Sequence, residues 1–319
     1  MTLIHPRIFS DGFTQSELST FGACAQKWHW RYNEMIDKAG SYSMALMVGT
    51  AFHDSMEQFY KTLGKRVNVA TLQFEEHVVP SADDYQDLTY WNAVLPMIVR
   101  AYTIYYKDDF QLFTVEQIEE EVDVKWEGFR LRGKIDLRFE ELNGLFIMDH
   151  KTSGRLTKET VAGWDFRFQF MFYLWLKTIQ DPAIKKRLKG YWINAVKKPE
   201  LRVKKNESIP QFAQRCFEDM VAEPEKYFYR ERFYVTKDLL EHFEKHVVTP
   251  RLNLLRAISD PKTPVWLAEG ILFNKNTDEC QHYMGAPCPY IDLCRHGEDK
   301  MGFLYRKRDQ KHMELAEES

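Results

Sequence analysis

The stretch that decides the fold is FRLRGKIDLRFEELNGLFIMDHKT, which spans residues 129–152. Apolar and charged residues alternate along its first half, and an Asn-Gly pair follows, which is a strong hairpin signal. We therefore predict two paired strands over 129–139 and 145–150. Residues 115–124 have the same texture of Val, Ile and alternating charge. The three segments predict an antiparallel meander.

Helical segments flank this meander on both sides. Before it, apolar spacing predicts helices over 14–37, 46–63 and 85–108, the first opened by a Thr14-x-x-Glu17 capping box and the third kinked or restarted at Pro96. After it we expect a helix over 157–180, a strand over 190–197 and helices over 210–222 and 236–258. This order predicts an α/β fold, a mixed central sheet flanked by helices.

We divide the chain into three parts on this pattern. Residues 1–110 form a helical N-terminal part, residues 111–205 a catalytic core, and residues 206–319 a helical and Cys-rich C-terminal cap. The last 50 residues show no clear period and look irregular. We expect them to be held by something other than a regular helix or strand.

Composition excludes several classes of protein. The 319 residues carry 44 Lys plus Arg against 47 Asp plus Glu, so no global basic excess indicates a nucleic acid, although a local basic groove can be masked. The chain has no apolar run near 18 residues, so we expect a soluble protein with no signal peptide and no membrane span. Five cysteines are too few for a secreted disulfide framework, so a reducing, cytoplasmic setting is expected.

Two carboxylates and one ammonium are expected to converge at the hairpin. If its strands pair, Asp136 lies beside Asp149, and Lys151 shares a face with Asp149 because the two are two residues apart. Hard oxygen ligands suit Mg²⁺ or Mn²⁺, which can activate water against a phosphodiester. Lys151 would orient that water or help to deprotonate it. The alternative is a surface hairpin whose Asp and Lys side chains face solvent.

Gly-x-x-Asp at 133–136 followed by Asp-x-Lys-Thr at 149–152 resembles the core of the PD-(D/E)XK nuclease superfamily, in particular its RecB-like exonuclease branch. The resemblance implies a restriction-endonuclease-like core. Gly49-Thr50-Ala51-Phe52-His53 resembles the upstream histidine motif of that branch, which implies His53 as a metal ligand. Gln169 and Tyr173 resemble its Gln-x-x-x-Tyr motif, and their shared helix face would let both reach a DNA phosphate or the edge of the metal site.

The resemblance also bears on further metal ligands. It implies that Asp136 and Asp149 hold the metal, and His150 is included as a candidate ligand. Members of the family often carry a glutamate on the strand before Gly-x-x-Asp. Three adjacent residues are candidates for it, and the sequence does not choose among them: Glu119, Glu120 and Glu121.

Four of the five cysteines form a second constellation. Cys24 lies in the first predicted helix, and Cys280, Cys288 and Cys294 fall close together near the end of the chain. This distribution resembles the iron-sulfur nucleases of the AddB and CRISPR-associated RecB-like type, which implies a 4Fe-4S cluster that staples the two chain ends together. The late cysteines are spaced more widely than is usual there, so a Cys₄ zinc site and unliganded thiols are alternatives. Cys216 is expected to be a small buried hydrophobic residue.

Two basic segments are candidates for the DNA contact. Residues 185–205 carry nine Lys or Arg residues interleaved with Tyr191 and Trp192, a texture that could follow a phosphate backbone and stack bases. The alternative is a solvated strand edge protected by lysines. Arg306, Lys307, Arg308 and Lys311 form the second cluster, which could equally be a tail.

We interpret the chain as a metal-dependent deoxyribonuclease, an exonuclease that hydrolyses phosphodiesters at DNA ends or on single strands. The alternatives are a structure-specific endonuclease and a non-catalytic DNA-binding subunit of a recombination complex. The resemblance implies work in DNA recombination, repair, phage DNA metabolism or CRISPR spacer capture, with a helicase or recombination protein as partner. It also implies a bacterial or phage-infected cell.

Overall fold

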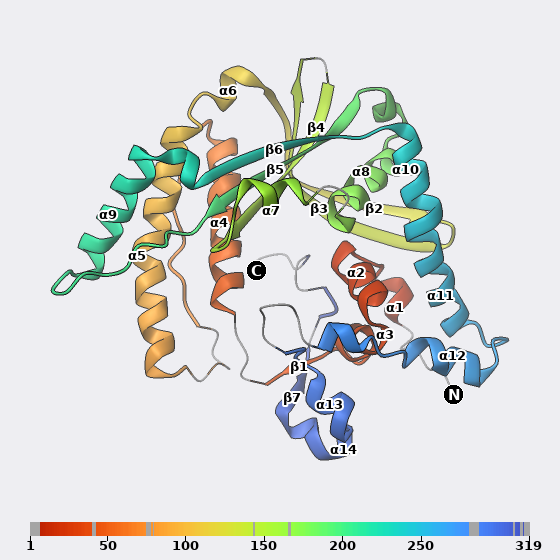
Figure 1. Cartoon of the computed structure of the whole chain (residues 1–319). Helices are drawn as coiled ribbons and strands as arrows, with labels where there is room; N and C mark the ends of the chain where they lie inside the picture. The colour runs from red at the N-terminus through yellow and green to blue at the C-terminus, as the bar shows by residue number, and fades with distance from the viewer. Residues whose placement is uncertain are drawn as a thin grey trace.

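A five-stranded mixed sheet lies at the centre of the molecule (Figure 1). The structure is a computed structural model, which describes residues 7–39, 43–74, 78, 80–142, 144–164, 167–280, 287–308, 310–312 and 315. The strand order is β2 (Thr114–Trp126), β3 (Phe129–Glu141), β4 (Gly144–Ser153), β5 (Leu188–Lys197) and β6 (Phe228–Tyr234). β4 and β5 are parallel and the other neighbours are antiparallel. The predicted meander and the α/β fold class are therefore confirmed, while Asn143 of the hairpin turn lies outside the described residues.

Helices cover both faces of this sheet (Figure 1). One face carries α4 (Met44–Lys61), α5 (Ala82–Tyr105) and α9 (Ile209–Ala222), and the other carries α2 (Gln15–Ala23), α8 (Phe168–Gln180), α10 (Lys237–Phe243) and α11 (Thr249–Ser259). The packing of β4 on both of its faces explains why its sequence is apolar at every position from Leu145 to Met148. Leu145 and Ile147 pack into the apolar cluster on the α8 face, whereas Phe146 and Met148 pack into the cluster on the α4 face. A strand covered on both sides needs no polar alternation.

The N-terminal helix predicted over 14–37 is broken, which corrects that prediction. Its parts are α2, α3 (Ala25–Trp28) and a π-helical turn over His29–Asn33. Cys24 interrupts the helix with an extended backbone, φ −159° and ψ 111°. The Thr14 hydroxyl accepts from the Glu17 backbone N–H, but the Glu17 carboxylate accepts from the Trp28 indole instead of closing a capping box. Cys24 therefore lies between two helices, as the last cap of α2 and the first cap of α3.

Other helices also differ from their predicted extents. The helix predicted over 157–180 consists of α7 (Lys158–Ala162) and α8, and the helix predicted over 236–258 contains a π-helical turn at Glu244–Val248. The remaining short helices are α1 (Arg7–Ser10), α6 (Asp109–Leu112), α12 (Val265–Leu272), α13 (Ile291–His296) and α14 (Glu298–Met301). Among the described residues, no helix is both long enough and apolar enough to cross a membrane.

The edge strand β6 and the small sheet at the chain ends were not predicted. β6 has the sequence FYRERFY, whose three central residues are charged, so it lacks the signature of a buried strand. β1 (Ile36–Lys38) pairs antiparallel with β7 (Tyr305–Lys307). Beyond β7, the Lys311 ammonium is buried 3.0 Å from the Glu17 carboxylate. Arg308 and Lys311 of the second basic cluster are thus internal, and neither can serve as a DNA contact there.

Candidate active site

Strands β3 and β4 separate at the predicted carboxylates. Their pairing ends at Leu137 and Met148, so Asp136 and Asp149 occupy the next position of the same register. Beyond it, β4 pairs only with β5. The Asp136 Oδ2 atom accepts a hydrogen bond from the backbone N–H of His150 at 2.8 Å, which replaces the lost ladder bond. The fork between the strands therefore places the two carboxylates at one opening.

Both β2 and β3 change the face on which their side chains pack as they reach this fork. Ile118 and Leu137 pack into the α4 cluster, whereas Val122 and Ile135, an even number of residues away, pack into the α8 cluster. The change falls at Glu119, whose φ of 50° is rare for a residue with a side chain. Strained backbone of this kind persists where the surrounding structure over-determines it and is common at functional sites.

Glu119 joins two other residues in a group that could hold a metal ion. Ligand atoms of His53 on α4, Glu119 on β2 and Asp136 on β3 all lie within 4.8 Å of one another. His53 Nδ1 lies 3.1 Å from Asp136 Oδ2. Glu120, in contrast, pairs with Arg138 and Lys177 on the other face. The donor set of two carboxylates and one imidazole fits Mg²⁺ or Mn²⁺.

Electrostatics in this group favour a bound cation. Burial raises the pKa of Glu119 to about 7, and the neighbouring charge of Asp136 adds to that rise. Burial opposes the charged form of His53, but the carboxylate of Asp136 raises the pKa of that imidazole to about 9. Carboxylates that repel one another in a buried place gain from a divalent ion, which stabilises the ionised forms of both.

Asp149 is held from two sides. Lys151 Nζ lies 2.6 Å from Asp149 Oδ2, and the Gln169 amide donates to Asp149 Oδ1 at 2.8 Å. Burial raises the pKa of Asp149 to about 6, although the Lys151 charge opposes that rise. The Lys151 side chain is 27% exposed, so its ammonium can face a substrate while it contacts Asp149. Gln169 thus orients a carboxylate at the site edge.

A model of the PD-(D/E)XK nuclease superfamily matches residues 12–295, a range that contains this fork. The chain belongs to the PD-(D/E)XK nuclease superfamily. Nucleases of this superfamily use divalent metals, in keeping with the carboxylate and histidine group.

The solved structures that are similar to this nuclease include the following two. A candidate exonuclease from Eubacterium rectale is 13% identical, with 90% of this chain and 94% of that chain covered and a TM-score of 0.40. The protein SSO0001 is 13% identical, with 79% of this chain and 84% of that chain covered and a TM-score of 0.25. No curated protein matches the chain in sequence. Because both TM-scores are below 0.5, the family assignment rests on the family model alone.

The glycine and the tyrosine of the two predicted motifs, Gly133 and Tyr173, lie against each other. A Cβ atom at Gly133 would lie 2.8 Å from Tyr173 Cε1, so the Tyr173 ring covers the backbone of Gly133. Any larger residue at 133 would push that ring, and with it α8, away from β3. Tyr173 therefore packs helix α8, which carries Gln169, against the strand that carries Asp136.

His150 does not join the metal group in this structure. It alternates with Asp149 along β4, so its imidazole faces α4 and α5, where it stacks on Tyr60 with ring centroids 5.7 Å apart. Its Nδ1 atom lies 2.7 Å from the Asn194 amide nitrogen. Burial lowers the pKa of this imidazole to about 3, so the ring is neutral.

The four cysteines of the second constellation line one cavity of about 50 Å³. The helix break at Cys24 lies beside the segment 274–276, because the Gln26 backbone N–H donates to the Asn274 carbonyl at 3.1 Å and Asn276 donates to the Ala23 carbonyl at 3.0 Å. Cys280, Cys288 and Cys294 complete the lining, while residues 281–286 lie outside the described residues. Cys216 is fully buried in α9, away from this cavity.

The basic segment 185–205 is divided by strand β5. Lys185 and Lys186 precede the strand, and Arg187 beside them is paired with Glu116 and Glu140. Lys197 ends the strand and Lys198 follows it, and the backbone N–H of Lys198 donates to the Ser153 carbonyl of β4. Since β4 and β5 are parallel, only this second half lies at the end of the sheet that carries Lys151.

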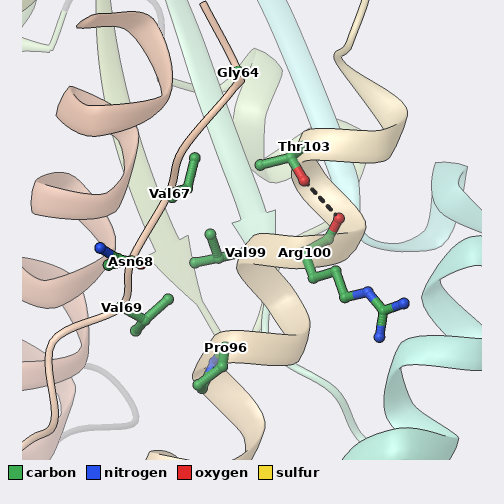
Figure 2. A pocket seen from close by; sticks show the side chains of 8 residues that line it. All are labelled: Gly64, Val67, Asn68, Val69, Pro96, Val99, Arg100 and Thr103. Atoms are coloured by element: carbon green, nitrogen blue, oxygen red, sulfur yellow. Dashed lines mark hydrogen bonds between the residues drawn. The ribbon is translucent and has the colours of Figure 1, made fainter. Parts of the chain in front are cut away.

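A separate open groove of about 420 Å³ lies between α5 and the segment after α4 (Figure 2). Its lining residues are Gly64, Val67, Asn68, Val69, Pro96, Val99, Arg100 and Thr103. This lining contains no carboxylate, imidazole or thiol, so the groove lacks the groups that phosphodiester hydrolysis needs.

Proposed function

We propose that this nuclease is a metal-dependent exonuclease that hydrolyses DNA at its ends or on single strands. The observation that carries the proposal is the fork of β3 and β4, which gathers His53, Glu119, Asp136, Asp149 and Lys151. Acidic oxygens beside an imidazole and an exposed ammonium suit the cleavage of an anionic substrate assisted by a divalent cation.

Each side chain has a distinct task in the proposed reaction. His53, Glu119 and Asp136 would hold the cation, with Asp149 beside them, and the cation when bound would polarise the phosphate and lower the pKa of water. Lys151 would orient the attacking water and offset negative charge on the phosphate as the transition state forms. Gln169 would keep Asp149 in place through its amide hydrogen bond.

The DNA path we propose passes over the ends of β4 and β5. Lys198 has its ammonium 4.7 Å from the centroid of the Trp91 ring, and burial lowers the pKa of this lysine. A cation on an indole face beside the end of β4 could contact both a phosphate and a base.

The test of this function compares linear with closed circular DNA. End-labelled linear duplex, linear single strands and covalently closed circles would be incubated with the protein and Mg²⁺ or Mn²⁺. We expect nucleotides to be released from the linear substrates and the circles to stay intact. Cleavage of the circles would favour the endonuclease alternative, and binding without cleavage would favour a non-catalytic subunit.

We also propose that Cys24, Cys280, Cys288 and Cys294 hold one 4Fe-4S cluster with a structural role. Their shared cavity supports a common ligand. In zinc sites of four thiolates the sulfurs lie about 3.8 Å apart, given a bond of about 2.3 Å. Within the described residues, which include all four cysteines, no three thiols lie within 4.8 Å of one another. Our proposal of a cluster in place of zinc implies the iron-sulfur branch, which works in DNA recombination and repair beside a helicase.

Charge around the cavity fits a ligand held by thiolates. Burial raises the pKa of Cys288 and of Cys294, while Lys27 and Lys275 act in the opposite direction. These two lysines would offset the negative charge of the thiolates. Elemental analysis of anaerobically purified protein, together with absorbance near 400 nm, tests the proposal. Four irons per chain would support it, and one zinc without iron would replace the cluster by a zinc site.

A further inference from the structure

A buried hydrogen-bonded network lies behind the fork and joins six elements. Each of α4, α5, α6, β4, β5 and β6 contributes one polar side chain to it. We call this network the node, and its members are Tyr60, Tyr102, Asp109, His150, Asn194 and Arg230. Five of them are at most 2% exposed, and the Arg230 side chain is 13% exposed.

An ion pair forms the centre of the node. Arg230 reaches Asp109 with both terminal nitrogens, Nη1 to Oδ1 at 2.8 Å and Nη2 to Oδ2 at 3.0 Å. The Tyr60 hydroxyl donates to the same carboxylate at 2.9 Å. A two-pronged arginine contact fixes orientation as well as distance. The pair therefore locks β6 and α6 to helix α4.

Asn194 links the ion pair to His150, because its side chain contacts both Arg230 and His150. Its Oδ1 accepts from Arg230 Nε at 3.3 Å, and because arginine can only donate, the amide nitrogen must point the other way. That nitrogen donates to the Tyr102 hydroxyl oxygen at 2.9 Å and to His150 Nδ1 at 2.7 Å. Because the amide nitrogen lies at His150 Nδ1, this contact selects one orientation of the His150 ring.

The node contacts the candidate metal site through two elements. The backbone N–H of His150 donates to Asp136 Oδ2, and its neighbour in the chain is Asp149. On α4, Tyr60 follows His53 by seven residues, which is two helical turns and therefore the same helix face. The helix and the strand that bring ligands to the site from opposite sides are thus anchored to one ion pair.

We propose that the node sets the distance between helix α4 and strand β4 and so positions the metal ligands. Its members are positioning residues, because none of them needs to touch the cation or the DNA. A buried ion pair is a poor source of stability, since the cost of removing its charges from water offsets much of their attraction. Fixing one geometry is the better-suited role for such a group. This inference rests on the proposed function, because it requires a divalent cation at the fork.

The experiment measures Mn²⁺ affinity from the EPR signal of free Mn²⁺, without DNA, alongside the melting temperature. Asn194→Ala removes the link to His150, and Tyr102→Phe removes a single oxygen from the node while keeping the ring. We expect Mn²⁺ binding to weaken about tenfold in Asn194→Ala and by a few-fold in Tyr102→Phe, on the scale seen for residues that support metal ligands.

Lys311→Met is the matched control. It breaks another buried ion pair, in which Lys311 and Glu17 are 3% and 0% exposed, on the far side of the sheet from the node. We expect a lower melting temperature for this variant with unchanged Mn²⁺ affinity. Wild-type Mn²⁺ affinity in a folded Tyr102→Phe or Asn194→Ala protein would overturn the inference and leave the proposed function standing. Absence of Mn²⁺ binding by the wild type would instead overturn both.

Discussion

The carboxylate site and the thiol site of this nuclease are held in different ways. At the fork, both predicted aspartates have protein partners of their own: Asp136 accepts from the His150 backbone N–H, and Asp149 contacts Lys151 and Gln169. At the cysteine cavity, the contacts of the Cys24 and Cys280 sulfurs within the described part of the chain are long ones to backbone carbonyls, at 3.9 Å each. The fork is organised by the fold itself, whereas under our proposal the cavity depends on the cluster that its thiols would hold.

This difference predicts opposite consequences of damage. Loss of a ligand at the fork should remove activity and leave the fold, because the strands and helices there are stabilised by two large apolar clusters. Loss of a thiol should cost stability first, because the apolar cluster beside the cavity is small: its buried members among the described residues are Ile36, Cys288, Tyr290 and Leu293. The predictions below test this contrast, from the largest expected effect to the smallest.

The largest effect is expected at the fork. Asp136→Ala, Asp149→Ala and Lys151→Ala should each lower cleavage of linear DNA by about a hundredfold or more, since metal-binding and proton-handling groups are lost. DNA binding should persist or tighten in the aspartate variants, because negative charge that faces the phosphate is removed. Gel-based cleavage and circular dichroism measure the two properties.

The surface pair Lys237 and Glu241 on α10 supplies matched controls for that experiment. Lys237→Ala and Glu241→Ala remove the same two kinds of charge at exposed positions, so the activity of each variant should equal that of the wild type. More than a tenth of wild-type activity in all three fork variants would contradict the assignment of the site.

At the cysteine cavity we expect loss of stability with loss of iron. A ligand that joins Cys24 to Cys294 closes most of the chain into a loop, and breaking it should cost about 2–4 kcal/mol on the analogy of a disulfide. Cys24→Ser and Cys288→Ser should therefore be colourless and melt earlier, as shown by elemental analysis and thermal unfolding. Cys216→Ser should keep both the colour and the activity. Equal melting temperatures of Cys24→Ser and the wild type would contradict a structural role for the cluster.

A smaller effect is expected from single metal ligands that have neighbours to compensate for them. His53→Ala and Glu119→Gln should shift the activation curve about tenfold towards higher Mn²⁺ while leaving the maximal rate closer to that of the wild type. Glu120→Gln is the control on the same strand, because Glu120 pairs with Arg138 and Lys177 instead. An unchanged Mn²⁺ activation curve for His53→Ala would show that His53 is not a metal ligand and has a structural role.

The smallest effect is expected at Tyr173. Tyr173→Phe keeps the ring that covers Gly133 and should lower turnover only a few-fold, by loss of one hydroxyl. Gly133→Ala should be worse, because its Cβ would lie 2.8 Å from that ring. Overpacking of this kind costs about 1–3 kcal/mol. Thermal unfolding measures the stability of the two variants, and we expect Gly133→Ala to be the less stable. A less stable Tyr173→Phe would show that the contact between Gly133 and the Tyr173 ring is unimportant.

The sequence predicted the regular part of the molecule because regular strands have a visible period. Alternation and the Asn-Gly turn indicated the meander, and the spacing of Asp149 and Lys151 placed both on one face. Glu119 could not be separated from its two neighbours, because the change of face at φ 50° breaks the alternation on which such a choice depends.

Long-range charge pairs explain most of what the sequence did not reveal. β6 was missed because Arg230, which points inward, looks like a surface residue until Asp109 is placed beside it. Lys311 looked like part of a basic tail, yet Glu17 from the other end of the chain neutralises it. The break at Cys24 follows Gly22, but an isolated glycine inside a helical pattern does not by itself mark the end of a helix.

The central claim is that the fork hydrolyses phosphodiesters with the help of a divalent cation. The most direct measurement is an add-back experiment on chelator-treated wild type and Asp136→Ala, with end-labelled linear DNA and increasing Mn²⁺. We expect no release of nucleotides by either protein before addition, and release that rises with Mn²⁺ in the wild type alone. Cleavage that persists in excess chelator, or equal release by Asp136→Ala, would contradict the claim.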